Sequence, residues 1–342
     1  MAEEVWMLQT KKADFKQIGA RFRIDPVTAR IIRNRGIEGE AAIDRYLNGT
    51  LDDLYDPMLL KDMERAVSIL CEAVDTGKKI RIVGDYDIDG VCSTYILLQA
   101  FERLGSDVDF EIPDRIKDGY GINESIIEQA HADGVEVILT CDNGISAFHQ
   151  VELAKKYGMT VVITDHHEVP LDGEKEKIPP ADAVIDPKQA DCPYPFPEIC
   201  GAVVAYKLVQ VLYARRGVPQ MEWLDLLEFA AIATVGDVMK LQDENRILVK
   251  YGLKKMAQTK NLGLRRLAEK NNLDLGAITA YHIGFVIGPC LNAGGRLKTA
   301  KEALALLRAQ SEEEAERLAE ELKELNDTRK DMTEQGTEAA KL

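Results

Sequence analysis

The chain has 342 residues, of which 46% are hydrophobic and 30% are charged, and its formal net charge is -15. This composition is typical of a folded protein with a sizeable core and gives no sign of disorder. The negative net charge argues against a protein that coats nucleic acid with a generally basic surface and against one that adheres to anionic membranes. A nucleic-acid substrate remains compatible with it if metal ions neutralise acidic residues in one cleft.

The chain shows no signature of export or of a membrane span. Its first residues contain no basic segment followed by an apolar core, and no apolar stretch reaches the length of a membrane span. The six cysteines are scattered and form no C-x-x-C pair. We therefore expect reduced thiols and a cytoplasmic location, although Cys192 and Cys200 flank a proline-rich loop and leave a bridge or a metal site open.

Residues 1–75 are predicted to form a helical leader. The Asp25-Pro26 start signal precedes an expected helix over residues 27–33, and apolar residues at helical spacing predict another over residues 62–74. Residues 51–60 between them predict an irregular crossover. No cluster of catalytic side chains stands out in this leader.

Residues 76–200 are predicted to form a mostly parallel, doubly wound sheet, because apolar strands alternate with helices. Asn123 is expected to cap the middle one of three helices. The expected strands cover residues 79–84, 108–113, 135–140, 160–164 and 183–185, and the expected helices cover residues 92–104, 123–131 and 146–157.

A proline-rich piece at residues 192–197 separates the sheet from a helical part over residues 201–310. We expect helices there over residues 202–212 and 223–234, with shorter ones up to residue 270. Ser311 and Glu314 form a capping-box pattern, which opens a long charged helix over residues 311–342. A helix this polar usually bridges two domains or pairs with a partner.

Three aspartates follow the first predicted strand in the run Gly84-Asp85-Tyr86-Asp87-Ile88-Asp89-Gly90. Alternate side chains of an extended segment point the same way, so we expect these carboxylates on one side. Such close like charges are unfavourable unless a divalent cation neutralises them, and a solvated turn is the alternative. We expect Gly90 to turn the chain into a helix whose free N–H groups, with Ser93 and Thr94, receive a phosphate.

Three further motifs end predicted elements in a similar way. Asp142 opens an Asp-Asn-Gly turn after the third strand, Asp165-His166-His167 follow the fourth strand, and Asp237 ends an apolar helix. A turn, a satisfied histidine and a helix cap are the respective alternatives. Open α/β sheets keep their chemistry at the carboxyl ends of strands, so we expect these residues to converge. Carboxylates with imidazole suit Mn²⁺ or Mg²⁺, and two such ions would support phosphoester hydrolysis.

A glycine-rich run covers residues 288–298 and contains Gly294, Gly295, Asn292 and Arg296. We predict a flexible loop in which the Asn292 amide and the Arg296 guanidinium hold a phosphate. A helix-capping loop is the alternative. His282, a few residues earlier, is expected to take part in packing or hydrogen bonding rather than in metal binding.

Taken in order, these acidic and histidine motifs and the glycine-rich run resemble the DHH family of phosphoesterases. Within that family the chain is most similar to the bacterial exonucleases specific for single-stranded DNA. The similarity extends into the leader, at residues 29–32, 36–37, 56–57 and 62–67, and so covers nearly the whole chain.

The resemblance implies Mn²⁺- or Mg²⁺-dependent removal of nucleotides from the 5′ end of single-stranded DNA in recombination and repair. It suggests a single-strand-binding protein or a helicase as partners. Asp165 would orient the histidines, His167 would contact the scissile phosphate or assist proton transfer, and Arg296 beside Asn292 would bind a substrate phosphate. The implied metal ligands are Asp87, Asp89, Asp142, His166 and Asp237, with Asp142 between two ions and Asp85 supporting or joining them.

Two features depart from the family pattern. The phosphate clamp commonly has a basic residue where this chain has Cys290. The family's DHH-associated domain and oligonucleotide-binding barrel do not follow residue 342, so we expect a fragment that binds weakly and acts with low processivity. Two alternatives stay open: hydrolysis of short oligoribonucleotides, cyclic dinucleotides, nucleotide phosphates or pyrophosphate, and a non-catalytic replication scaffold, which would be expected to lack some of these ligands.

Overall fold

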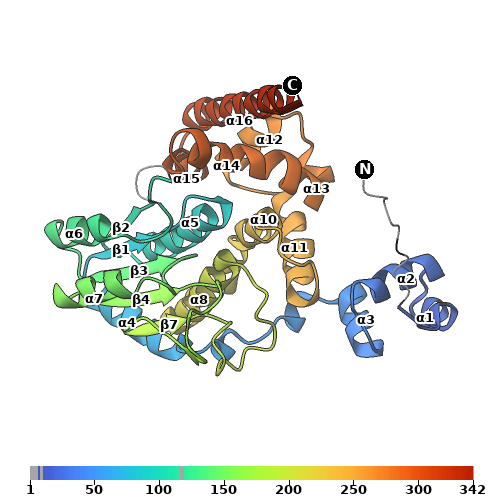
Figure 1. Ribbon diagram of the computed structural model, residues 1–342, viewed down its shortest axis with the longest axis horizontal. Coiled ribbons are helices and arrows are strands. Elements are labelled where there is room, and N and C mark those ends of the chain that lie inside the picture. The colour runs from blue at the N-terminus through green and yellow to red at the C-terminus, as the bar shows by residue number, and fades with distance from the viewer. Residues whose placement is uncertain (1–6, 8–10, 116–118, 342) are drawn as a thin grey trace.

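A parallel sheet of five strands forms the centre of the computed structural model, which describes residues 7, 11–115 and 119–341 (Figure 1). The strand order is β2-β1-β3-β4-β7, and every neighbouring pair is parallel. This confirms the predicted α/β class. The strands are β1 (Ile80–Val83), β2 (Val108–Glu111), β3 (Val137–Cys141), β4 (Thr160–Thr164) and β7 (Ala183–Ile185). A small antiparallel hairpin of β5 (Leu171–Asp172) and β6 (Lys175–Glu176) was not predicted.

Helices cover both faces of the sheet, as the alternation of side chains along each strand requires. Ile80 and Ile82 of β1 enter the larger core, which they share with α4 (Met63–Asp75), α5 (Ile88–Arg103) and α8 (Gly201–Arg216). Ile138 of β3 and Ile163 of β4 enter a second core with α6 (Glu124–Ala132) and α7 (Phe148–Lys156). Asn123 caps α6 as predicted, because its side chain accepts a hydrogen bond from the Ile126 N–H.

The order of the strands reverses between β1 and β3. From β1 the chain passes through α5 to β2 at one edge, and it then returns to β3 on the other side of β1. In open α/β sheets such a reversal leaves a crevice at the carboxyl ends of the two strands. The fold therefore places the residues that follow β1 and β3 at the mouth of this crevice.

Helix α5 begins at Ile88, four residues before its predicted start at residue 92. The Asp87 side chain accepts hydrogen bonds from the Asp89 and Gly90 N–H groups and so caps the helix. The predicted helix over residues 223–234 is two helices, α9 (Gln220–Leu224) and α10 (Leu227–Gly236). Asp225 lies between them and forms ion pairs with Lys255 and Lys260.

The predicted loop over residues 288–298 is wrong, because the segment is helix α14 (Gly288–Leu297), which continues directly from a π-helix (Ile283–Ile287). Pro289 is tolerated because it lies at the start of the helix. The glycines permit close packing rather than flexibility. A Cβ at Gly295 would lie 2.3 Å from the Tyr86 carbonyl oxygen, and one at Gly294 would lie 2.7 Å from the Thr299 carbonyl oxygen.

The helices after α11 (Asp243–Met256) form a layer beyond the sheet, with α16 lying along one side of it, whereas α11 packs against α10 (Figure 1). Ser311 Oγ accepts a hydrogen bond from the Glu314 N–H (3.2 Å), which is one half of the predicted capping box. The other half is absent, because the Glu314 carboxylate accepts its hydrogen bond from the Gln310 N–H and not from the Ser311 N–H. The buried residues of α16 all lie in its first half, the last being Asn326. Besides α14, the helices of this layer are α12 (Leu262–Lys270), α13 (Ala280–His282), α15 (Lys301–Arg308) and α16 (Glu312–Lys341).

Three helices of the leader stand apart from the sheet (Figure 1): α1 (Phe15–Phe22), α2 (Pro26–Asn34) and α3 (Glu40–Asn48). They have a small core of their own around Ile32, Ile37, Ile43 and Tyr46. The crossover predicted after them contains two short 3-10 turns, Leu51–Asp53 and Pro57–Leu59. Helix α4, which we had grouped with the leader, packs in the main core. Within the described ranges, no helix has the length and apolar character needed to cross a membrane.

Candidate metal centre

The three aspartates after β1 do not form the extended segment that we predicted. Asp89 already lies in the first turn of α5, although Asp85 and Asp87 still direct ligand atoms to one group with Asp142. Asp85 Oδ1 lies 3.3 Å from the Gly121 N–H, whereas Asp87 Oδ1 caps α5. The two oxygens of Asp89 accept hydrogen bonds of 2.7 Å from the Gly201 and Ala202 N–H groups at the start of α8. The run thus joins the ends of two helices.

Asp142 follows β3 and holds a strained position at the centre of the site. Its φ of 61° lies in the left-handed region, which side chains other than glycine rarely adopt. The residue is 2% exposed. Burial and the neighbouring charges of Asp89 and Asp87 raise the pKa of the Asp142 carboxyl well above its usual range. In the described structure, the carboxylates around Asp142 have no cationic neighbour other than a histidine. A buried carboxylate in such surroundings is suited to bind a positive ion.

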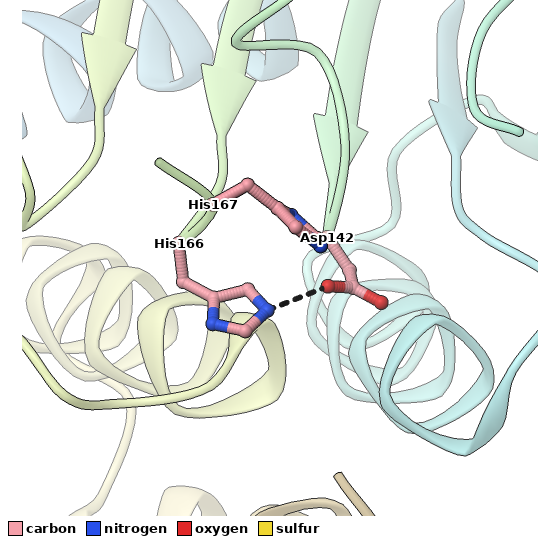
Figure 2. A group of neighbouring side chains, drawn as sticks. All are labelled: Asp142, His166 and His167. Carbon is pink, nitrogen blue, oxygen red and sulfur yellow. Dashed lines mark ion pairs between the residues drawn. The ribbon is translucent and has the colours of Figure 1, made fainter. Parts of the chain in front are cut away.

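His166 points its Nε2 atom into this group of carboxylates. The Nε2 atom lies 3.1 Å from Asp142 Oδ1 (Figure 2), 3.4 Å from Asp89 Oδ2 and 3.9 Å from Asp237 Oδ2. Burial lowers the pKa of His166, although Asp89 partly opposes this effect. A neutral imidazole presents a lone pair, which is the form that a metal ligand requires.

Asp165 fixes both histidines. Its Oδ1 atom accepts hydrogen bonds from the His166 N–H (2.7 Å) and the His167 N–H (3.2 Å), and it lies 2.7 Å from His167 Nδ1. Burial disfavours a charge on His167, but the hydrogen bond and the charge of Asp165 outweigh burial and raise the pKa of His167 to about 9. His167 therefore carries a proton at neutral pH, unlike His166.

Side chains from these segments form three groups in which the potential ligand atoms lie within 4.8 Å of one another. Asp142 belongs to two of the groups, and so does His166. The Asp85 Oδ2 atom is buried without a hydrogen-bond partner. Burial and the charges of nearby aspartates raise the pKa values of Asp85 and Asp237 to about 7. Oxygen-rich groups with one imidazole fit hard divalent cations such as Mn²⁺ or Mg²⁺. The groups are Asp85, Asp87 and Asp142; Asp89, His166 and Asp237; and Asp142, His166 and His167.

Ser93 does not face the site, so its prediction as a phosphate ligand needs correction. The side chain is fully buried, and its hydroxyl donates a hydrogen bond of 2.7 Å to the Asp89 carbonyl oxygen. Thr94 bonds the Gly90 carbonyl oxygen in the same way. The Asp87 carboxylate occupies the N-terminus of α5 that we had expected a phosphate to use. Gly90 leaves room for the Asp85 backbone, since a Cβ there would lie 2.4 Å from the Asp85 carbonyl oxygen.

Asn292 and Arg296 of α14 line a cavity of about 170 Å³ together with Gly236, the residue before Asp237. Arg329 of α16 lines the same cavity and was not predicted. Among the described residues, the Arg329 guanidinium bonds only the Asn326 Oδ1 atom, at 3.1 and 3.2 Å. Neither arginine forms an ion pair with a carboxylate in the described part of the chain. Arg329 is thus a second cation in the cavity lined by the residues that were predicted to hold a phosphate.

Two neighbours of the clamp have structural contacts. Cys290 is fully buried and lies 3.6 Å from Asn326 Nδ2, so it contacts α16 rather than the cavity. His282 Nδ1 accepts a hydrogen bond of 3.1 Å from the N–H of Thr279, a residue outside the glycine-rich run. His282 belongs to none of the three candidate ligand groups found among the described residues.

Two residues shape the rim of the site: Tyr120, which sequence reasoning missed, and Asn143, which it placed in a turn without giving it a role. The Tyr120 hydroxyl donates a hydrogen bond of 2.9 Å to the Asp142 carbonyl oxygen and lies 3.1 Å from His167 Nε2. Asn143 Nδ2 bonds the Val83 and Cys141 carbonyl oxygens and so ties β1 to β3. The only sequence signal for Tyr120 is its position between Gly119 and Gly121, both of which have positive φ.

Comparison with known proteins identifies the family. Residues 79–234, which run from β1 to α10, match the DHH family, N-terminal domain. A crystal structure of exonuclease RecJ bound to manganese is 35% identical, and its TM-score is 0.72 over 80% of this chain and 68% of that chain. The chain belongs to the DHH family. All of the strands and the whole candidate metal centre lie between residues 79 and 237, so the DHH match and the site nearly coincide.

Other DHH relatives are matched over much of the chain but are considerably longer. The single-stranded-DNA-specific exonuclease RecJ of Bacillus subtilis (strain 168) is 37% identical over 98% of this chain and 41% of its own length. A structure of RecJ in complex with Mn²⁺ from Thermus thermophilus is 32% identical, with a TM-score of 0.77 over 94% of this chain and 44% of that one. The chain therefore spans less than half the length of these two relatives.

Proposed function

We propose that this chain is a divalent-metal-dependent phosphodiesterase that removes nucleotides from the 5′ end of single-stranded DNA. The observation that carries the proposal is that two ligand groups lie side by side: Asp85, Asp87 and Asp142 form one, Asp89, His166 and Asp237 form the other, and Asp142 Oδ1 lies 3.1 Å from His166 Nε2. Adjacent ligand groups would place two ions close together, as in two-metal phosphodiester-cleaving sites. The similarity to RecJ supports single-stranded DNA as the substrate.

The proposed ligands are Asp85, Asp87, Asp89, Asp142, His166 and Asp237, with Asp142 between two sites for Mn²⁺ or Mg²⁺. The chemistry that two bound ions supply is activation of a water and stabilisation of charge on the phosphate. Asp89 holds the start of α8 with both oxygens, so it positions this helix as well as offering a lone pair to a metal.

His167 is proposed to contact the scissile phosphate and to donate a proton to the departing oxygen. It is protonated at neutral pH and is 44% exposed in its side chain, whereas the Asp165 side chain beside it is 1% exposed. Asp165 acts as a positioning residue because it orients the ring and sustains its charge. Asn292 and Arg296 are proposed to hold a substrate phosphate in the cavity beside Asp237, with Gly294 and Gly295 allowing α14 to pack there.

The matched relatives are longer than the stretch that this chain matches. We propose that their processivity on long strands and their recruitment of a single-strand-binding protein or a helicase depend on the parts that this chain does not match. We propose residues 76–310 as the catalytic part, residues 1–75 as a leader and residues 311–342 as a linking helix.

A substrate panel in Mn²⁺ tests the function. Single-stranded DNA with a 5′ phosphate should be cleaved faster than duplex DNA, short RNA or a cyclic dinucleotide, and a 5′ label should appear first in mononucleotides. Asp142→Ala should abolish this cleavage with an unchanged circular dichroism spectrum. Preference for a cyclic dinucleotide would show that the substrate is wrong, and full activity of Asp142→Ala would show that the site is wrong.

A further inference from the structure

The leader of this acidic chain contains a strongly basic segment. Residues 11–35 contain eight basic and two acidic side chains, a net charge of +6 in a chain whose total is -15. Such asymmetry of charge within one chain indicates a separate interaction with a polyanion. The basic residues are Lys11, Lys12, Lys16, Arg21, Arg23, Arg30, Arg33 and Arg35.

The segment is a rigid helix-turn-helix formed by α1 and α2. A Cβ at Gly19 would lie 2.8 Å from the Ile24 carbonyl oxygen, so the missing side chain lets the turn pack on α1. Arg23 closes α1 in a left-handed conformation with a φ of 56°. Ile32 of α2 belongs to the small core shared with α3. The basic side chains are therefore carried on a folded scaffold rather than on a free tail.

Most of these cations have no acidic partner among the residues that the structure describes. Arg21 and Arg33 pair with Glu40 (3.5 Å) and Glu38 (2.7 Å). The other six form no ion pair within the described ranges, and five of them are exposed: Lys12, Lys16, Arg23, Arg30 and Arg35. The cations of α12 behave differently, because Arg265, Arg266 and Lys270 all pair with glutamates of α16.

The outward face of α2 combines these charges with apolar contact surface. Val27 and Ile31 are 65% and 50% exposed, and both lie within one helical turn of Arg30. The Arg30 guanidinium lies 4.5 Å from the centre of the Phe15 ring, so α1 holds it in place. Arg23 precedes α2 and Arg35 follows it. Arginines flanking small apolar side chains suit a strand that presents phosphates on one side and sugars and bases on the other.

We propose that the outward face of α2, with Arg23, Arg30 and Arg35, binds the phosphate backbone of a nucleic acid. Outside this face the chain is acidic overall, so a polyanionic strand is repelled by most of the surface and attracted here. The phosphodiester chemistry proposed for the metal centre favours a nucleic acid over an acidic protein as the partner. Binding at α2 requires no metal, so it can be measured separately from cleavage.

The test compares a triple variant, Arg23→Gln with Arg30→Gln and Arg35→Gln, with the parent chain. Affinity is measured by fluorescence anisotropy in EDTA, for single-stranded and duplex DNA of about 20 nucleotides, between about 50 and 200 mM KCl. We expect the variant to lose roughly tenfold in affinity, and the slope of log K against log salt for the single strand to become shallower by about 2, at about 0.7 per phosphate contact. The form of DNA that shows the loss is the one that α2 binds.

A matched control removes three exposed cations from the body of the chain: Arg65→Gln, Lys156→Gln and Lys175→Gln. These residues also form no ion pair in the described structure, so the control changes net charge equally. It should bind DNA within about twofold of the parent. A further control is Arg30→Lys, which keeps the positive charge at residue 30. It should keep the parent salt slope, because the slope depends on the number of cations that contact phosphates. The proposal would be overturned if the triple variant kept the affinity and the salt slope of the parent for both forms of DNA. It would also be overturned if the control lost as much affinity as the triple variant.

Discussion

Gly201 packs so closely against Asp142 that a Cβ at residue 201 would lie 2.7 Å from the Asp142 Cβ and 2.9 Å from its Oδ1. Either the start of α8 or the strained Asp142 must shift if Gly201 becomes alanine. We expect Gly201→Ala to lower kcat/KM for Mn²⁺-dependent cleavage by about tenfold or more, with a loss of stability of about 1–3 kcal/mol.

Gly336 provides the control for this prediction. It lies in α16 with no atom within 4 Å of a Cβ built there. Gly336→Ala should leave activity unchanged and stabilise the helix by up to about 1 kcal/mol. Equal activity of the two alanine variants would mean that the contact between α8 and Asp142 is not needed for the site.

Asp142→Asn should stabilise the metal-free protein while removing its response to metal. The substitution keeps the shape of the side chain and removes a buried charge that Asp89 and Asp87 oppose. At pH 8 in EDTA we expect a gain of roughly 1 kcal/mol in the free energy of unfolding. Mn²⁺ should raise the Tm of the parent by mass action and raise that of the variant much less.

Asp186→Asn is the matched control for the metal response. Asp186 is buried and has a pKa raised to about 7, mainly by burial, but it belongs to none of the candidate ligand groups among the described residues. Its variant should keep the full Mn²⁺-induced rise in Tm. The metal assignment would be contradicted by an Asp142→Asn protein that responds to Mn²⁺ as strongly as the Asp186→Asn protein.

Glu228, outside the candidate ligand groups, should make stability fall as pH rises. Burial raises the pKa of Glu228 from 4.5 to about 7, so the folded protein binds more protons than the unfolded chain between these values. Stability from this group is full below about pH 4.5 and is lost as the pH rises through 7, by at most about 3 kcal/mol. The free energy of unfolding of Glu228→Gln, relative to that of the parent, should therefore be higher at pH 8 than at pH 5. Urea unfolding at both pH values measures this, and parallel pH profiles of the two proteins would refute it.

Arg329→Gln should weaken recognition of a substrate phosphate. The Arg329 and Arg296 guanidinium groups line one cavity, and neither has a carboxylate partner in the described structure. We expect a rise of roughly tenfold in KM for a strand with a 5′ phosphate and a smaller rise for one with a 5′ hydroxyl. Arg317 lies on the same helix and, among the described residues, pairs only with Glu321, so Arg317→Gln should leave both KM values unchanged.

The sheet was predictable because each buried strand appears as an apolar run between turn residues. The positions of Asp142 and Asp165 followed from the strands, since the carboxyl ends of parallel strands share one edge of the sheet. The prediction that Asp85, Asp87 and Asp89 form one extended segment was wrong. The Asp87 side chain caps α5, so the helix begins earlier than the apolar pattern suggests.

The glycine-rich run shows the limit of local reasoning. Glycines predict a flexible loop when only their neighbours in sequence are considered, yet Gly295 contacts Tyr86, more than two hundred residues away. Arg329 and Tyr120 escaped prediction for a related reason. Each reaches its cavity or rim through a tertiary contact, and the surrounding sequence marks neither residue apart from the two glycines that flank Tyr120.

The hydrogen bonds from Gly201 and Ala202 to Asp89 have a consequence for local opening of the fold. The first N–H groups of a helix usually exchange with solvent readily because they lack partners within the helix. Here a fully buried carboxylate from another helix holds them. The start of α8 should therefore exchange its amide hydrogens as slowly as the middle of the sheet, and fraying of this end would have to release a side chain of the metal centre at the same time.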